Sequence, residues 1–359
     1  MHASIHVLAS LAVGRALFPK SGKAAMITTG IAGTISDLDW LSRFWGPASY
    51  LNLHRTYTHS IAGALVLSVV TCAILAWAFP RGERAFAARA PEAGSRERAP
   101  VRSQGSRHGL GGPIFAAAVC AALLHMAMDA CQADGMELFW PFRANRVALD
   151  WLPNIDPWIL ALLAASLLLP ELLHLVSSEI GAKTKKPHGR LGAIIGLGAV
   201  FCYTGARAIL HVDAVAGLQA RTYHREWPRR VAAFPEALSL FSWNAVVETD
   251  STLRVLTIQV GPRASFDPES GRTFYKPEAS AALDAAGDAP IARRFLSFAR
   301  FPKATIQTAD RGGYRVEFRD LRNVAVQATQ DEVAALVHVD ADGLVADQEL
   351  FWARGLSGR

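Results

Sequence analysis

The feature that most constrains the fold is an uncharged apolar run from Ser60 to Phe79. Its twenty residues, SIAGALVLSVVTCAILAWAF, include no Asp, Glu, Lys or Arg. A helix rises about 1.5 Å per residue, so a run of this length matches the roughly 30 Å of hydrocarbon in a bilayer. The run therefore predicts a membrane-spanning helix.

Five further stretches are apolar enough to enter a membrane. Three are long: Pro113–Met128, interrupted by His125; Pro157–Ser178, with one internal proline and Glu171; and Leu191–Leu210, which is rich in glycine. Two are shorter, His6–Phe18 and Ala24–Ile35, and would be tilted or partly inserted. We therefore predict six membrane segments. The N-terminal MHASIHVLASLAVG lacks the basic start and the convincing cleavage site of a signal peptide, so we expect it to stay in the mature protein.

The net charge of +6 is distributed as a topology signal rather than as a nucleic-acid-binding face. Basic residues gather in FPKSGK, in Arg81–Arg107 with seven arginines against three glutamates, and in Lys183–Arg190. Cytoplasmic loops carry such an excess, so we expect these segments in the cytoplasm of a multi-pass protein of the bacterial inner membrane. The periplasmic side then receives the N-terminus, residues 36–59 and 133–156, and everything after about 212. The loop 81–112 is poor in apolar residues, which predicts disorder.

After Tyr223 the long apolar runs give way to alternating apolar and polar residues. Three segments show this pattern: SWNAVVETDSTLRVLTIQV, ATIQTADRGGYRVEFRDLR and AALVHVDADGLVADQELFW. Alternation around turn signals such as DRGG and DADG is typical of β-hairpins. DADG lacks the remaining ligands of a calcium loop and is interpreted as a turn. We predict an α-helical membrane domain, residues 1–222, followed by a small β-rich soluble domain of antiparallel strands, residues 225–359.

Imidazole and carboxylate side chains gather at the ends of the predicted membrane segments. Residues four apart, as in HMAMD, project from one face of a helix. The predicted topology places all of these side chains toward the periplasmic face. The sequence therefore predicts a metal site with seven candidate ligands: His6, Asp37, Asp39, His54, His59, His125 and Asp129.

Each candidate also has an ordinary structural role open to it. A lone histidine in IHVLASL can be a packed interfacial side chain, the aspartates of SDLDW can end a helix, and the HxxxD pair can be an internal hydrogen bond. Aspartate and histidine inside or beside a membrane are costly, however, and usually serve a function. Their coincidence on one side favours the metal site.

The chemistry of the candidates indicates which ion would bind. Imidazole and carboxylate ligands without thiolates suit Zn²⁺, Mn²⁺ or Fe²⁺, and we expect Zn²⁺ first. There are more candidates than four ligands, so either two ions bind or one ion binds with residues that orient its ligands. Asp39 would bridge two ions or act as a general base, and Arg55 would bind an anionic group such as phosphate. Thr58 and Ser60 would orient ligands or cap the following helix.

These motifs resemble a known family. An N-terminal histidine, a DxD pair, HRxxTHS and a downstream HxxxD, set among membrane helices, look like the YdjM family of inner-membrane metal-dependent hydrolases. The resemblance continues through Ala148–Leu163, with Asp150 and Asp156, and through RFLSFARFPKATIQ and its hairpins, which resemble the extra domain of longer members. It implies a hydrolase with a bound divalent metal. The order His, Asp, His and HxxxD is also distantly similar to zinc-dependent phospholipase C, which implies a phosphoester substrate. No obvious second set of histidines and a glutamate, as a three-ion site would need, follows downstream.

We therefore expect a membrane-bound metal-dependent hydrolase that acts on a lipid or small-molecule phosphoester through metal-activated water. Its partners would be membrane lipid and that substrate, with no nucleic acid. The alternative is a metal-binding membrane scaffold or a transporter-like protein without hydrolytic activity. A transporter needs polar residues that continue across the bilayer, and the third and fifth predicted segments offer few.

Overall fold

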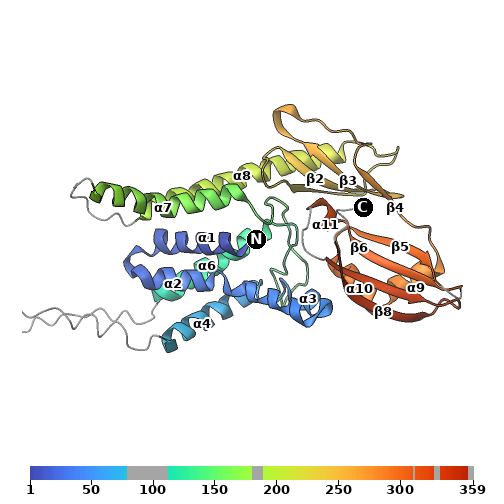
Figure 1. Ribbon diagram of the computed structural model, residues 1–359, viewed down its shortest axis with the longest axis horizontal. Coiled ribbons are helices and arrows are strands. Elements are labelled where there is room, and N and C mark those ends of the chain that lie inside the picture. The colour runs from blue at the N-terminus through green and yellow to red at the C-terminus, as the bar shows by residue number, and fades with distance from the viewer. Residues whose placement is uncertain (79–111, 180–188, 310–311, 327–331, 355–359) are drawn as a thin grey trace, which may run out of the picture.

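The computed structural model describes residues 1–78, 112–179, 189–309, 312–326 and 332–354. In these residues a bundle of helices forms one end of the molecule and two β-sheets form the other (Figure 1). The helical part comprises α1 (Ala3–Leu17), η1 (Pro19–Ser21), α2 (Gly22–Ala32), η2 (Ile35–Trp45), α3 (Pro47–Leu53), α4 (Ile61–Ala78), α6 (Gly112–Ala130), α7 (Pro157–Glu179) and α8 (Arg190–Gln219).

Among the described residues, four helices are long and apolar enough to cross a membrane. They are α4, α6, residues Pro157–Val176 of α7, and α8. The expected number of six segments is therefore wrong. With 15 and 11 residues, α1 and α2 reach about 22 Å and 16 Å at 1.5 Å per residue, which is less than the hydrocarbon thickness. They form a hairpin joined at η1 that packs against the long helices (Figure 1).

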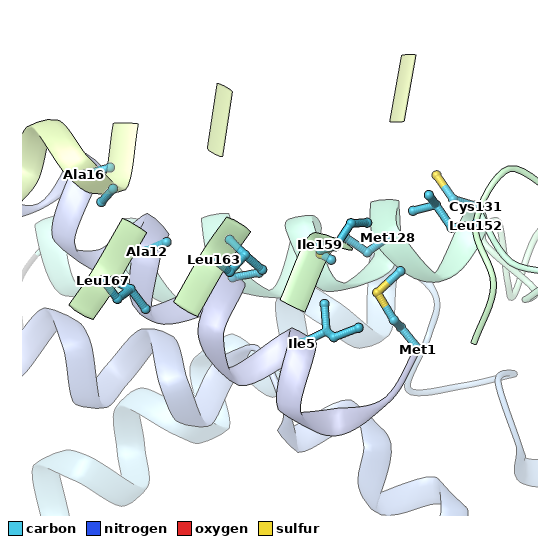
Figure 2. Close-up of a cluster of buried hydrophobic side chains, with 12 residues drawn as sticks. Met1, Ile5, Ala12, Ala16, Met128, Cys131, Leu152, Ile159, Leu163 and Leu167 are labelled. Atoms are coloured by element: carbon cyan, nitrogen blue, oxygen red, sulfur yellow. The ribbon is translucent and has the colours of Figure 1, made fainter. Parts of the chain in front are cut away.

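A core of aliphatic side chains holds α1 within the bundle. Ile5, Ala12 and Ala16 of α1 face Leu163 and Leu167 of α7 in one buried cluster (Figure 2). Small residues such as alanine let helices approach closely, which is a main source of helix association where lipid surrounds the bundle. The core therefore fixes α1 beside α7.

Helices α7 and α8 approach each other at two glycines four residues apart. A Cβ at Gly192 would lie 2.7 Å from the carbonyl oxygen of Ser166, and one at Gly196 would lie 2.3 Å from the Ser166 Cβ. Only glycine leaves room for this contact. At its other end α8 leaves the apolar region, and its residues Ala214 and Leu218 pack into the core of the first sheet. One helix thus joins the membrane region to the sheets.

The C-terminal region contains two four-stranded antiparallel sheets, where one small sheet was expected. The first has the order β1 (Arg230–Pro235), β2 (Ser242–Glu248), β3 (Thr252–Gln259), β4 (Arg272–Tyr275), and η3 (Gly261–Arg263) follows β3. The second has the order β5 (Pro302–Thr308), β6 (Tyr314–Asp320), β7 (Glu332–Val339), β8 (Val345–Ala353). Helices α9 (Ala281–Asp288) and α10 (Pro290–Phe298) pack on the second sheet, and the short α11 (Arg322–Ala325) follows β6.

The three predicted hairpins are present as β2–β3, β5–β6 and β7–β8. The DADG segment is a turn, as predicted. Its Gly343 has a φ of 84°, and Asp340 accepts hydrogen bonds from the amides of Asp342 and Leu344 at 3.0 and 2.8 Å. The carboxylate is therefore engaged within the turn itself.

The helix ends define two poles. The junction of α1 and α2, the end of α4 and the facing ends of α7 and α8 lie away from the sheets (Figure 1). The N-terminus lies at the opposite pole, next to the sheets. Lys20, Lys23 and Arg190 belong to the first pole by their place in these elements. The predicted disorder of 81–112 concerns residues outside those described, except Gly112, which begins α6.

Two aspartates of the segment after α6 connect the sheets to the helices. Arg300 donates two hydrogen bonds to Asp150, at 2.6 and 2.7 Å. Asp156 accepts hydrogen bonds from two amides at the start of α7 and from the Tyr203 hydroxyl at 2.9 Å. Arg207, fully buried, donates to that same hydroxyl and to two carbonyls of the β1–β2 loop. Asp150 and Asp156 therefore serve as structural anchors.

Candidate metal centre

One group of side chains in the described part of the chain brings ligand atoms close enough to share a metal ion. It consists of His6 on α1, Asp37 on η2, and His125 and Asp129 on α6. One ligand atom from each lies within 4.8 Å of all the others. Zinc binds nitrogen and oxygen at about 2.0–2.2 Å, so small side-chain movements would close the four around one cation.

His125 is oriented by the end of α2. Its Nδ1 lies 2.8 Å from the carbonyl oxygen of Gly33, and since a carbonyl only accepts, Nδ1 donates and Nε2 carries the free lone pair. That Nε2 lies 3.6 Å from Asp37 and 3.7 Å from Asp129. A ring nitrogen held by a backbone carbonyl while the other faces a carboxylate pair is the usual arrangement of a metal-binding histidine.

His6 approaches the same point from α1. Its Nε2 lies 3.0 Å from Asp129 Oδ1, and its ring stacks on that of His125 with centroids 3.8 Å apart. The amino group of Met1 lies 2.5 Å from the same carboxylate oxygen. His6 and Asp129 are fully buried, so the carboxylate depends on these neighbours for its solvation.

His59 lies directly beside the group of four. Its Nε2 is 3.2 Å from His125 Nε2 and 3.3 Å from Asp129 Oδ2, and its Nδ1 is 3.0 Å from Asp39 Oδ2. The carboxylate of Asp39 therefore sets the direction of the His59 ring, with Nε2 toward the cluster. His59 can join the four as a further ligand.

Asp39 and His54 lie behind His59 and outside the group of four. Asp39 also accepts hydrogen bonds from the Arg55 amide at 2.7 Å and the Thr58 hydroxyl at 3.1 Å, and its Oδ1 lies 3.3 Å from His54 Nδ1. Burial favours the neutral acid, but hydrogen bonds with His54 and His59 outweigh it and hold the pKa of Asp39 well below its ordinary value. Its predicted role as ligand or base stays a prediction; the contacts describe a carboxylate that orients His59.

Arg55 places a buried guanidinium against the cluster. Its Nη2 donates to Gln132 at 2.6 Å and lies 3.2 Å from Asp129 Oδ2. Its backbone has a φ of 57°, which is uncommon for a residue with a side chain. The turn of HRTYTHS thus holds both a ligand candidate and a cation at the start of α4.

The donor set fits a divalent cation. Asp37 Oδ2 is buried and has no hydrogen-bond partner among the described residues. Asp129 Oδ2 is also buried, and it lies 3.2 Å from Arg55 Nη2 and 3.3 Å from His59 Nε2. A buried carboxylate oxygen without a partner is costly, and a cation coordinated by both carboxylates and the facing imidazoles would remove that cost. Imidazole with carboxylate and no thiolate suits Zn²⁺, Mn²⁺ or Fe²⁺.

Protonation of His59 would compete with such a cation. Burial alone lowers the pKa of His59, but hydrogen bonds with Asp129, Asp37 and Asp39 raise it to about 10. Because a histidine binds metal in its neutral form, metal binding would release this proton and would strengthen as the pH rises.

Two residues of the site were not predicted from the sequence. Gln132 follows Asp129 by three positions, so the helical spacing of α6 could have indicated it. No sequence pattern indicated Gly33, because it contributes through its backbone carbonyl, which accepts the hydrogen bond from His125, and not through a side chain. A Cβ there would lie 1.8 Å from Ser10 Oγ, so glycine is what lets the end of α2 reach both α1 and His125.

Comparison with known proteins shows which protein family this architecture belongs to. An uncharacterised protein of Bacillus subtilis (strain 168), YfhP, is 26% identical over 141 residues, which are 39% of this chain and 35% of that protein. The chain thus spans about a third of that relative's length. No solved structure matches. The family described as YdjM inner membrane protein matches residues 1–214. These residues contain α4, α6, α7 and the part of α8 up to Ala214, together with His6, Asp37, His125 and Asp129. The chain belongs to the YdjM family of inner membrane proteins.

Proposed function

We propose that this membrane protein is a metal-dependent hydrolase that acts on a phosphoester of a membrane lipid. The observation that carries the proposal is the convergence of His6, Asp37, His125 and Asp129 beside the buried cation of Arg55. A centre of this kind sits where α4 and α6 leave the apolar region on the side of the sheets. When bound, a divalent cation supplies Lewis-acid chemistry and lowers the pKa of a bound water.

The surrounding residues suggest a division of roles. Asp37 is the partly exposed member of the cluster, with 26% of its side chain accessible, whereas the other three are buried. Substrate would therefore reach the site from the side of η2. Arg55 would hold the phosphate oxygens through its guanidinium, and Asp39 would keep His59 directed at the reacting centre.

Helix η2 supports a lipid as the substrate. A 3₁₀-helix has three residues per turn, so every third side chain lies on one face. Ser36, Asp39 and Ser42 point inward, whereas Leu38, Leu41 and Phe44 form an outward row that is 59%, 41% and 74% exposed. An exposed apolar row beside the start of a spanning helix suits contact with acyl chains. Such a row would bring lipid next to Asp37.

The activity can be tested with Asp37→Asn. We expect the metal-loaded wild-type protein to hydrolyse phospholipid or a generic phosphoester, and the variant to lose about 100-fold or more, since loss of a ligand should exceed the 10–100-fold that outer residues cost. The melting temperature should stay close to that of the wild type because Asp37 is partly exposed. Asp284→Asn, an exposed position of α9, serves as the matched control. Full activity of Asp37→Asn, or none in a metal-loaded wild type, would contradict the proposal.

We also propose that the pole with the metal centre and the sheets faces the periplasm. Lys20, Lys23 and Arg190 mark the other pole, and basic residues favour the cytoplasmic side. A periplasm-active reporter fused after Arg359 should therefore be active, and the same reporter inserted within 81–107 should be inactive. Equal activity of both fusions would show that the two poles do not lie on opposite sides of the membrane.

A further inference from the structure

Three arginines from distant parts of the chain meet next to the metal centre. Arg55 precedes α4, Arg146 lies in the segment between α6 and α7, and Arg322 begins α11 in the sheet region. Figure 1 shows α11 at the border between the sheets and that segment. The three guanidinium groups belong to two structural regions, so only the folded protein brings them together.

Contacts close these arginines into a ring. Asp134 lies between two of them, with its Oδ1 2.9 Å from Arg322 Nη1 and its Oδ2 3.7 Å from Arg55 Nη1. Arg146 and Arg322 lie over the same Phe298 ring, at 4.7 and 5.6 Å from its centroid. Arg146 also donates to the carbonyl of His54, the residue before Arg55, at 3.0 Å.

The ring has more donors than acceptors. Four of its guanidinium nitrogens are buried without a hydrogen-bond partner among the described residues: Arg55 Nε, Arg55 Nη1, Arg146 Nε and Arg322 Nε. The carboxylate of Asp320 lies 3.3 Å from Arg322 Nε but makes no hydrogen bond to it. Burial, followed by the neighbouring Arg322, lowers the pKa of Arg146 to about 10, which agrees with a local excess of positive charge.

Asp134 occupies the position that an external anion would take. Its side chain is 39% exposed, so it can swing into solvent, whereas Arg55 and Arg322 are buried and fixed. A tetrahedral oxyanion offers more acceptor oxygens than a carboxylate, and guanidinium forks match phosphate geometry.

We infer that Arg55, Arg146 and Arg322 form a phosphate-binding site in which a phosphate group replaces the carboxylate of Asp134. The site rests on the proposed function for its role, since Arg55 also touches Asp129 and so places the phosphate of a phosphoester beside the metal centre. Because Arg322 belongs to the sheet region, that region would take part in recognising the substrate. The ligand class is a phosphate mono- or diester, or free phosphate.

Binding of inorganic phosphate tests the site without any need for hydrolysis. The full-length protein, in a phosphate-free detergent and treated with a chelator, is titrated with phosphate by calorimetry. Arg322→Gln should weaken binding by about 10–100-fold, the value of a charge-assisted hydrogen bond. Asp134→Asn removes the competing carboxylate and should strengthen phosphate binding. Arg230, on β1, is paired with Glu248 of β2, and the control variant Arg230→Gln should bind phosphate as the wild type does.

The outcomes separate the alternatives. Wild-type affinity in Arg322→Gln, or no phosphate binding in any protein, would overturn the site. If Arg322→Gln does not fold, Arg146→Gln gives the same comparison from the other side of Phe298. Phosphate binding that persists while no hydrolysis is found would reject the proposed activity and keep the site. Mass spectrometry of co-purified phospholipid distinguishes the sources: a lipid phosphate predicts depletion in Arg322→Gln, and free phosphate predicts equal lipid content.

Discussion

We expect His125→Ala to lose its divalent metal almost completely. His125 Nδ1 is fixed by Gly33 and its Nε2 faces both carboxylates of the cluster, so the substitution removes a directed ligand and not a peripheral contact. Outer residues cost about 10–100-fold in metal affinity, and the loss of a ligand should exceed this. Competition with a chelating dye, on protein in detergent, measures the affinity directly.

The matched control is His174→Ala. His174 also lies on a spanning helix, but near the end of α7 that lies away from the sheets. It should keep wild-type metal affinity. Thermal melting of both variants checks that each is folded. Equal metal affinity of His125→Ala and the wild type would show that His125 is not a ligand of the metal. An equal loss of metal affinity in both variants would indicate a general effect on the bundle.

The second large effect concerns stability. Arg207→Leu should lower the free energy of unfolding by about 3–5 kcal/mol, the usual result of removing one partner of a buried charged network. Arg207 is fully buried and donates to Tyr203, Ser239 and Glu236. Its loss leaves the two carbonyls unpaired and removes a cation that lies 3.9 Å from Asp156. Denaturant or thermal unfolding in detergent provides the measurement.

Arg294→Leu provides the comparison for this effect. Arg294 is exposed on α10, and surface substitutions usually change stability by no more than about 0.5 kcal/mol. A small effect of Arg207→Leu, similar to that of Arg294→Leu, would show that the contacts between α8 and the β1–β2 loop do not hold the sheets in place.

The sequence predicted the spanning helices better than the helices inside the bundle. Ser60–Phe79 appears as α4, Ile61–Ala78, because a run of this length without charge suits a spanning helix. His6–Phe18 and Ala24–Ile35 were misread as membrane segments. Residues packed among other helices need the same apolar character as residues in lipid, so composition alone does not separate the two.

The strands were predicted by alternation, but their division into two sheets was not. Alternation reports that one face of a strand is buried; it does not report which strands become neighbours. The break between β4 and β5 is filled by α9 and α10, whose short, alanine-containing segments have no long periodic pattern. This is why one sheet was expected.

The site was predictable in part. His125 and Asp129 share a helical face at a spacing that the sequence displays. The DxD pair did not reveal that Asp37 joins the cluster while Asp39 lies behind His59. That distinction arises because η2 is a 3₁₀-helix, in which residues two apart lie on different faces. Arg322 follows Asp129 by nearly two hundred residues, in another region, and nothing local in the sequence connects them.

The most direct test of the account is the metal content and ligand set of the wild-type protein. Elemental analysis of protein purified without added metal should find at least one divalent transition metal ion per chain. X-ray absorption at the edge of that metal should show only nitrogen and oxygen ligands at about 2.0–2.2 Å if the ion is zinc, with the outer-shell scattering of imidazole. Protein that contains no such metal, and binds none when it is supplied, or a spectrum with sulfur ligands, would contradict a centre built from His6, Asp37, His125 and Asp129.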